Sequence, residues 1–246
     1  MSLEAPGQRN AYAVETEGLS KFFGHIAALR DVTVQVPYGQ FVTIIGPNAA
    51  GKTTLIRILS TISRPSGGRV CVDGLDVQRR GAEIRRRIGV AGHWTMLYGD
   101  LSVVENLRFY GRMYRVADLE ERISELVTKV ELTGRQHDAV RTLSRGMQQR
   151  LSIARAILHN PSILFLDEPY TGLDERATEI LNGLLHELHT RSHTILMTTH
   201  QLVRAAEMSD QVFVFLRGQV VHEANIGGLS MQDLRLIYHR YVEGRQ

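Results

Sequence analysis

Short apolar runs alternate with amphipathic stretches along most of the chain. Runs of this length, separated by helical patterns, are typical of parallel strands that are buried on both faces. The clearest helix is predicted over Glu175–Arg191, where apolar side chains recur at helical spacing and form a single stripe. The predicted buried strands are Phe41–Ile45, Ile88–Ala91, Ile163–Asp167, Thr194–Thr198 and Val212–Leu216. The pattern therefore predicts an α/β fold built on a parallel sheet.

The N-terminal part of the chain follows a different pattern. Tyr12–Leu19, Ala28–Val36 and Arg69–Val72 alternate between apolar and polar residues and have Gly or Pro between them, which predicts antiparallel strands. The middle of the chain is mostly helical in pattern and includes a predicted helix over Leu119–Leu132. We expect one domain over 1–246, with a core over about 1–92 and 151–222, a helical subdomain over about 93–150 and a C-terminal helical tail over about 223–246.

Composition and charge exclude several classes of protein. With 43% hydrophobic and 22% charged residues, the chain is neither disordered nor fibrous. No apolar run approaches the ~20 residues that cross a bilayer, the first ten residues lack a secretory signal, and one cysteine, Cys71, fits a reducing compartment. The net charge of +3 is mild, and we interpret the arginines of 79–87 as a solvated helix face. We therefore expect a cytoplasmic protein with no nucleic-acid partner.

A phosphate-binding loop is predicted between the strand Phe41–Ile45 and a helix over Thr53–Ser60. The segment from Gly46 to Thr53 matches G-x-x-x-x-G-K-[ST], in the strand-to-helix context that the motif requires. Backbone N–H groups of such a loop and the helix N-terminus bind phosphates. We expect Lys52 to reach the terminal phosphates and Thr53 to ligate Mg²⁺. The predicted nucleotide contacts in this loop are Gly46, Pro47, Asn48, Ala49, Ala50, Gly51, Lys52, Thr53 and Thr54.

Two adjacent carboxylates follow the predicted strand Ile163–Asp167. Asp167, at the carboxyl end of the strand, can hold the Mg²⁺ shell, and Glu168 can polarise a water for attack on a γ-phosphate. A strand that ends in a solvated acidic turn is the alternative. The phosphate loop upstream favours a nucleotide hydrolase.

Three further stretches complete an ordered set of motifs. These are Leu143–Gln148, with Ser144 as a possible N-cap of a helix, Gly172–Asp174, and His200 after the strand Thr194–Thr198. Taken with the phosphate loop and the two carboxylates, they resemble the ATP-binding-cassette (ABC) ATPases over nearly the whole chain. The resemblance implies a P-loop NTPase fold that hydrolyses ATP with Mg²⁺. It also implies a homodimer in which each ATP lies between the phosphate loop of one chain and the Leu143–Gln148 segment of the other.

The same resemblance implies roles for individual residues. Ser144, Gly146 and Gln148 would contact the ATP held by the other chain, and Asp174 would link the two sites. His200 would join Glu168 and Lys52 as a catalytic residue. Phe23 falls where the family stacks an aromatic ring on adenine, although core packing is the alternative for Phe22–Phe23.

Four residues, in three segments, depart from the family pattern. Ala49 stands where the family usually has Gly, and Ala resists a positive φ. Arg145 and Met147 replace residues of the usual Leu-Ser-Gly-Gly-Gln segment. His93 stands where the family usually has a catalytic Gln, so we expect a catalytic role for it. Its ring would contact Mg²⁺ through a bound water. Lys52 and the other catalytic positions are kept, so hydrolysis is still expected.

These departures and their neighbours resemble the ATPase subunit of the haem exporter of cytochrome c maturation. The implied partner is a separate integral membrane subunit, contacted through Trp94, Met96, Leu97, Tyr98 and Phe109–Tyr114, at the cytoplasmic face of the membrane. Another small-molecule, lipid or polysaccharide exporter is the alternative. An ABC ATPase that acts on DNA or ribosomes, and a P-loop kinase or GTPase, fit the chain less well.

Overall fold

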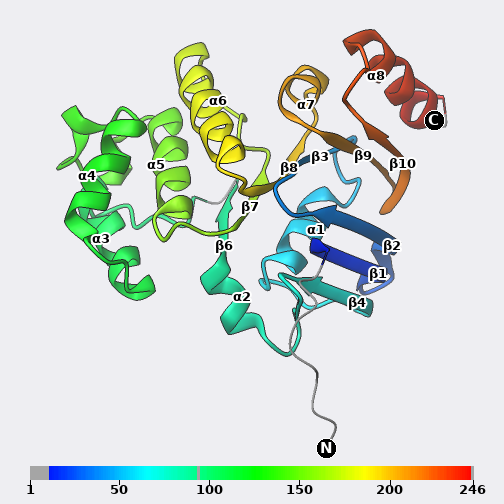
Figure 1. Cartoon of the computed structure of the whole chain (residues 1–246), viewed down its shortest axis with the longest axis horizontal. Helices are drawn as coiled ribbons and strands as arrows, with labels where there is room; N and C mark the ends of the chain where they lie inside the picture. The colour runs from blue at the N-terminus through cyan, green and yellow to red at the C-terminus, as the bar shows by residue number, and fades with distance from the viewer. Residues whose placement is uncertain (1–10, 93–94, 245–246) are drawn as a thin grey trace, which may run out of the picture.

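A six-stranded sheet forms the centre of the structure, a computed structural model that describes residues 11–92 and 95–244 (Figure 1). The strand order is β10-β9-β3-β8-β7-β6, and every neighbouring pair is parallel except β10 with β9. The strands are β3 (Phe41–Ile45), β6 (Ile88–Ala91), β7 (Ile163–Asp167), β8 (Thr194–Thr199), β9 (Gln211–Leu216) and β10 (Gln219–Asn225). Strands β3, β8 and β7 are neighbours, so the segments that follow their carboxyl ends lie at one edge of the sheet.

The edge strand β10 adds one antiparallel strand to the predicted parallel sheet. It pairs antiparallel with β9 through a two-residue turn, Arg217–Gly218. Both turn residues have positive φ, 51° and 79°, as a tight hairpin turn requires. The half-exposed alternation of β10 differs from the continuous burial of the parallel strands, which is why it was not predicted as part of this sheet.

The predicted N-terminal antiparallel strands form a second sheet of order β2-β1-β4-β5. These strands are β1 (Tyr12–Phe23), β2 (Ile26–Pro37), β4 (Gly67–Val72) and β5 (Leu75–Asp76). Helix α1 (Lys52–Leu59) lies between the two sheets, and its apolar side chains share one core with both (Figure 1). Cys71 is buried in β4 as a small apolar side chain.

The helical subdomain contains α3 (Val103–Tyr114), α4 (Leu119–Lys129) and α5 (Arg145–Ile157), with short 3-10 turns at Thr133–Arg135 and Val140–Thr142. Its helices lie together on the side of the molecule opposite β1 and β2 (Figure 1). Ser102 and Glu105 form a capping box at the start of α3. The fully buried amide of Asn106 donates to three backbone carbonyls of the preceding loop, which fixes that loop on the subdomain.

The remaining helices cover the core and its C-terminal edge. They are α2 (Gly81–Arg87), α6 (Glu175–Thr190), α7 (Leu202–Met208) and α8 (Met231–Tyr238), followed by a π-helical turn at His239–Glu243. Helices α7 and α8 pack with β9 in a core of their own. In the part of the chain that the structure describes, no helix has the length and apolar character needed to cross a membrane.

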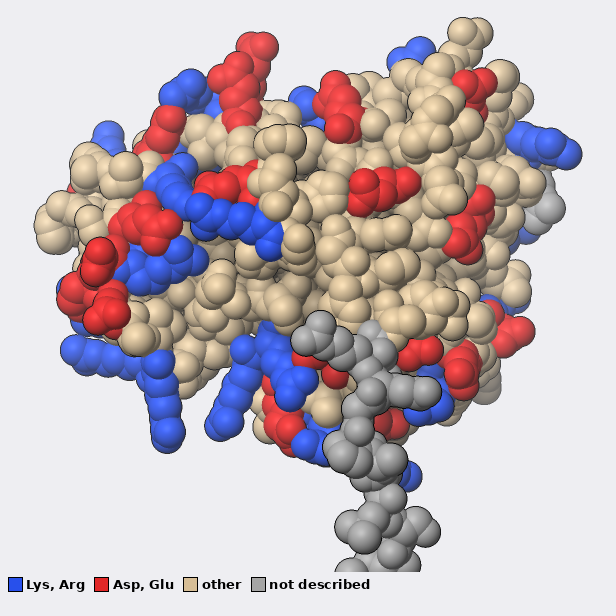
Figure 2. Space-filling view, viewed as in Figure 1, with Lys and Arg blue, Asp and Glu red and all other residues tan. Residues whose placement is uncertain are grey.

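The arginines of α2 and its flanks have neighbours within the chain. Arg80 pairs with Glu83, Arg87 pairs with Asp73, and Arg85 donates to the hydroxyl of Thr61. Figure 2 shows acidic and basic side chains interspersed on the visible face. This face therefore lacks the large basic surface that binding to a nucleic-acid backbone uses.

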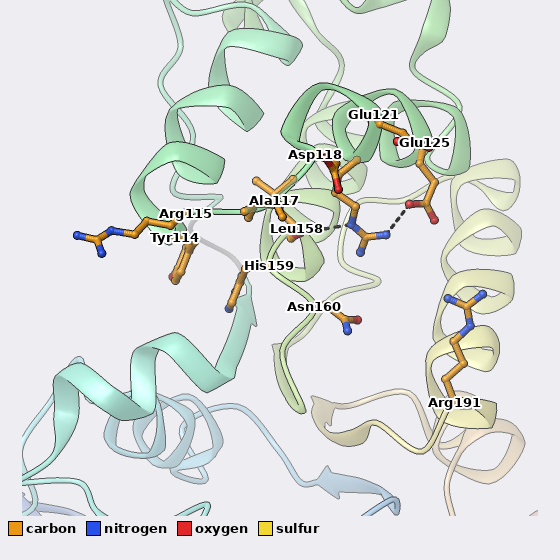
Figure 3. A pocket seen from close by; sticks show the side chains of 12 residues that line it. Tyr114, Arg115, Ala117, Asp118, Glu121, Glu125, Leu158, His159, Asn160 and Arg191 are labelled. Atoms are coloured by element: carbon orange, nitrogen blue, oxygen red, sulfur yellow. Dashed lines mark hydrogen bonds and ion pairs between the residues drawn. The ribbon is translucent and has the colours of Figure 1, made fainter.

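The ring of His159, two residues after the end of α5, is stacked on the ring of Tyr114 at the end of α3. The ring planes are nearly parallel, at 5°, and the centroids are 3.9 Å apart. Figure 3 shows the two side chains facing each other. Nε2 of His159 lies 3.0 Å from the carbonyl oxygen of Ile88, to which it donates. Burial lowers the pKa of His159 to about 4, so the ring is neutral near pH 7.

This depressed pKa makes His159 a source of acid sensitivity. An unfolded chain protonates a histidine near pH ~6.5, whereas the folded chain resists protonation until about pH 4. Stability that is present above pH ~6.5 is therefore lost as the pH falls toward 4. We expect the Tm of His159→Phe, which keeps an aromatic ring against Tyr114, to fall less over this interval than that of the wild type. Parallel Tm profiles from calorimetry would contradict this assignment.

Candidate active site

The predicted phosphate loop connects β3 to α1 as a tight turn against the sheet. A Cβ at Gly46 would overlap the carbonyl oxygen of Phe215, so only glycine fits there. Gly51, just before α1, has a φ of 104°, and a Cβ there would lie 2.6 Å from the carbonyl oxygen of Ala28. Ala49 has a φ of 62°, in the left-handed region. Ala49 therefore adopts a backbone conformation that glycine takes more easily, at a cost of about 1–2 kcal/mol for a residue with a Cβ.

The contact at Gly46 leads to a stability prediction. We expect Gly46→Ala to lower the free energy of unfolding by about 1–3 kcal/mol, because the backbone of β9 must move to admit a methyl group. Urea denaturation measures the effect. Gly134→Ala is the matched control, since nothing lies within 4 Å of its added Cβ. Equal midpoints for the two variants would show that the loop adapts freely.

Lys52 begins α1 with its side chain buried beneath the loop. Its Nζ donates to the carbonyl oxygens of Gly46 at 2.7 Å and Pro47 at 3.1 Å. Nζ also lies 3.5 Å from Oε1 of Glu168, and only 6% of the Lys52 side chain is exposed. The ammonium group is thus held among oxygen atoms at the mouth of the loop, where phosphate oxygens can replace the carbonyls.

Asp167 and Thr53 meet at the carboxyl end of β7. The Thr53 hydroxyl donates to Oδ1 of Asp167 at 3.1 Å, and the hydroxyl of Thr198 in β8 donates to the same oxygen at 2.6 Å. Gly92 allows this packing, because a Cβ there would lie 3.0 Å from Cβ of Asp167. A carboxylate and a hydroxyl beside a phosphate loop are the hard oxygen ligands that suit Mg²⁺, so these residues fit the ion.

Glu168 has a strained backbone that is held by β8. Its φ is 51°, a conformation that costs about 1–3 kcal/mol and is concentrated at functional sites. The Glu168 N–H donates to both the carbonyl and the hydroxyl oxygen of Thr198, each at 3.1 Å. Nδ1 of His200 donates to Oε2 of Glu168 at 2.9 Å, while Lys52 lies beside Oε1. The Glu168 carboxylate is thereby fixed between two nitrogen donors, an arrangement that can orient a base toward a water.

Thr198 is the residue of this site that the motifs did not predict. It is fully buried in an apolar strand, so the sequence alone presents it as an ordinary β-branched core residue. Its hydroxyl contacts both carboxylate residues of the site, Asp167 through the side chain and Glu168 through the backbone. A polar residue near the end of a strand that precedes His200 was the available signal.

The Leu143–Gln148 segment and Asp174 lie at helix starts. Ser144 caps α5 by accepting from the Met147 N–H, and Asp174 caps α6 by accepting from the Ala177 N–H at 2.8 Å. The side-chain amide of Gln148 donates to two carbonyl oxygens of its own subdomain. Among the described residues, no hydrogen bond or ion pair joins Ser144, Gly146, Gln148 or Asp174 to Lys52 or its loop. One chain therefore does not bring the two halves of the predicted ATP site together.

Two further predictions concern residues outside this constellation. Phe23 ends β1 with 53% of its surface exposed, so the core-packing alternative for Phe22–Phe23 is wrong and the ring is available for stacking. Lys21 Nζ lies 4.9 Å from the Phe23 ring centroid. His93, and with it Trp94, lies outside the described residues.

Comparison with known proteins agrees with this geometry. The family model described as "ABC transporter" matches residues 29–171. The ABC transporter ATP-binding protein NatA of Bacillus subtilis is 34% identical over 87% of this chain and 89% of its own length. The daunorubicin/doxorubicin resistance ATP-binding protein DrrA of Streptomyces peucetius is 38% identical over 92% of this chain and 71% of its own length.

A solved structure has the same fold with nucleotide products in place. The dimeric ATP-binding cassette MJ0796, in a post-hydrolysis state with ADP and phosphate bound, is 28% identical, and its TM-score is 0.81 over 88% of this chain and 100% of its own length. Neither relative named above is a haem exporter, so the expectation of a cytochrome c maturation ATPase is unsupported. The chain belongs to the ABC transporter family and is an ATP-hydrolysing cassette of that family.

Proposed function

We propose that this chain energises a separate integral membrane subunit, at the cytoplasmic face of the membrane, for export of an amphiphilic small molecule. The observation that carries the catalytic part is the junction of Lys52, Glu168 and His200 at the edge of the sheet. The proposed substrate class is supported by DrrA, which is named for resistance to daunorubicin and doxorubicin, and the proposed membrane partner is supported by the match to the ABC transporter family.

The catalytic roles follow from the contacts of each side chain. Lys52 binds the terminal phosphates of ATP in place of the loop carbonyls, and Thr53 with Asp167 holds Mg²⁺. When bound, the ion neutralises phosphate charge. Glu168 orients and accepts a proton from the attacking water, while His200 fixes its carboxylate from the solvent side. Phe23 supplies an exposed ring for the adenine.

A second copy of the chain completes the proposed site. Ser144, Gly146 and Gln148 at the start of α5, with Asp174 at the start of α6, make no hydrogen bond or ion pair with the phosphate loop of their own chain among the described residues. Placing them on the ATP of a partner copy gives them a ligand. The dimeric form of MJ0796 supports this arrangement.

An exposed aromatic patch on the helical subdomain supports contact with a membrane partner. We define this patch as Tyr98, Phe109, Tyr110 and Met113. The Tyr98 and Phe109 rings meet edge to face, with centroids 4.9 Å apart, yet 48% and 41% of these residues are exposed, and 61% of Met113. Contiguous exposed apolar side chains of this kind mark protein interaction surfaces.

The test combines hydrolysis, partner capture and cell phenotype. A homodimeric site predicts that specific ATPase activity rises with protein concentration, and activity per chain that is independent of concentration would contradict it. Affinity purification from native membranes should bring down one integral membrane protein, whereas Phe109→Asp in the aromatic patch should lose it.

Deleting the gene should sensitise cells to amphiphilic compounds and leave haem attached to c-type cytochromes. Loss of haem-stained c-type cytochromes would overturn the substrate assignment in favour of haem export.

A further inference from the structure

Arg155 is a buried cation without a carboxylate partner. Arg155 lies on α5, and only 6% of its surface is exposed. Its Nη2 donates to the carbonyl oxygen of Val90 at 2.6 Å, and its Cζ lies 5.2 Å from the centroid of the Tyr110 ring. Its Nε is buried without a hydrogen-bond partner, and no Asp or Glu pairs with it in the described parts of the chain.

A guanidinium in this position is poorly compensated. Burying a charge is costly unless an opposite charge and hydrogen bonds offset the lost hydration. One carbonyl and one aromatic face supply part of that compensation. Burial is also the main influence on Arg155, and it lowers the pKa of the guanidinium. A negative group that reached Arg155 would therefore gain a strong, weakly screened interaction.

A small cavity lies beside Arg155 and has room for such a group. Its volume is about 110 Å³, several times the ~30 Å³ that one water occupies in the liquid. Arg85, Arg155 and His159 line it together with Met96 and Tyr114, and no described residue in its wall is acidic. The stacked Tyr114 and His159 rings also line a larger open cavity of about 640 Å³ (Figure 3).

We propose that this cavity binds a carboxylate supplied by an acidic side chain of the integral membrane partner. The inference rests on the proposed function, because it needs that partner. The Tyr110 ring links the cavity to the aromatic patch, because it lies against Arg155 and also contacts the rings of Tyr98 and Phe109. The Tyr110 hydroxyl also binds the Met96 carbonyl at the cavity wall. A partner segment with apolar residues for the patch and one carboxylate for Arg155 fits both surfaces.

Substitutions at Met96 test the charge of the cavity within this chain. Met96 lines the cavity and is 43% exposed, so its replacement leaves the folded core intact. We expect Met96→Glu to raise the Tm by about 2–4 °C relative to the isosteric control Met96→Gln, because it supplies the missing carboxylate. Met96→Lys should lower the Tm by a similar amount. The ordering should persist in about 1 M NaCl, where the Debye length is ~3 Å, since a buried pair is weakly screened. Equal Tm values for the three variants would overturn the proposal.

Capture of the membrane partner tests the source of the carboxylate. In native membranes, Met96→Glu should reduce the amount of co-purified integral membrane protein by at least roughly tenfold, because the introduced carboxylate pairs with Arg155 in place of the partner's carboxylate. Met96→Gln should retain the partner. Retention by Met96→Glu, with the wild type also positive, would overturn this inference alone. A wild type that captures no integral membrane protein would overturn the proposed function, and the Tm series would still decide whether the cavity takes a carboxylate.

Discussion

The Glu168→Gln variant is expected to bind ATP with near wild-type affinity and to lose almost all hydrolysis. The substitution keeps the shape of the side chain and one oxygen that can face Lys52 or His200, but its NH2 group cannot accept a proton from the water. Loss of a general base lowers the rate by roughly 10²–10⁴-fold. Single-turnover hydrolysis and equilibrium ATP binding, measured on the same preparation, separate the two effects.

A surface substitution supplies the control for Glu168→Gln. Glu179 lies on α6 with 63% of its side chain exposed, so Glu179→Gln should leave both hydrolysis and ATP binding unchanged. In Glu168→Gln an ATP-bound dimer should accumulate on gel filtration, because binding proceeds without turnover. Hydrolysis within twofold of the wild type would remove Glu168 from the catalytic role.

Lys52→Ala is expected to weaken the binding of ATP itself. The variant deletes a buried ammonium that lies at the mouth of the phosphate loop. A hydrogen bond to a charged group contributes about 1.5–3 kcal/mol, so ATP affinity should fall roughly 10- to 150-fold. Isothermal titration calorimetry with ATP and with AMP gives the measurement. AMP lacks the terminal phosphates, so its weaker binding should change little.

Lys129→Ala is the matched control for Lys52→Ala. Lys129 pairs with Glu125 and Glu187 on the surface, far from the loop in sequence, and its removal should leave ATP affinity unchanged. Unchanged ATP affinity in Lys52→Ala as well would contradict the role assigned to the loop. Circular dichroism should show both variants folded, because neither substitution changes an apolar residue of the core.

Most of the secondary structure was predictable because it depends on local periodicity. Strands β3, β6 and β7 have the predicted bounds, and α6 begins at the predicted Glu175. A buried parallel strand must be apolar on both faces, so the pattern identifies it without its neighbours. The hairpin β9–β10 was missed because a strand at the sheet edge is half exposed and lacks that continuous pattern.

The candidate site was partly predictable for a different reason. Lys52, Thr53, Asp167 and Glu168 stand in motifs whose spacing follows from the geometry of a strand, a loop and a helix. Thr198 carries no such signal, because the hydroxyl of a core threonine acquires a role only when β8 pairs with β7. The exposure of Phe23 likewise depends on where β1 ends relative to α1.

The family, the phosphate loop and the order of the catalytic motifs could be predicted from the amino-acid sequence, since each depends on residues that are close along the chain. The folded chain was needed to show which strands meet at the edge of the sheet, and hence that Lys52 and His200 flank Glu168. The fold also buries Arg155 where no carboxylate among the described residues pairs with it. The stability of a buried charge depends on every group around it, and folding brings those groups together from distant parts of the chain.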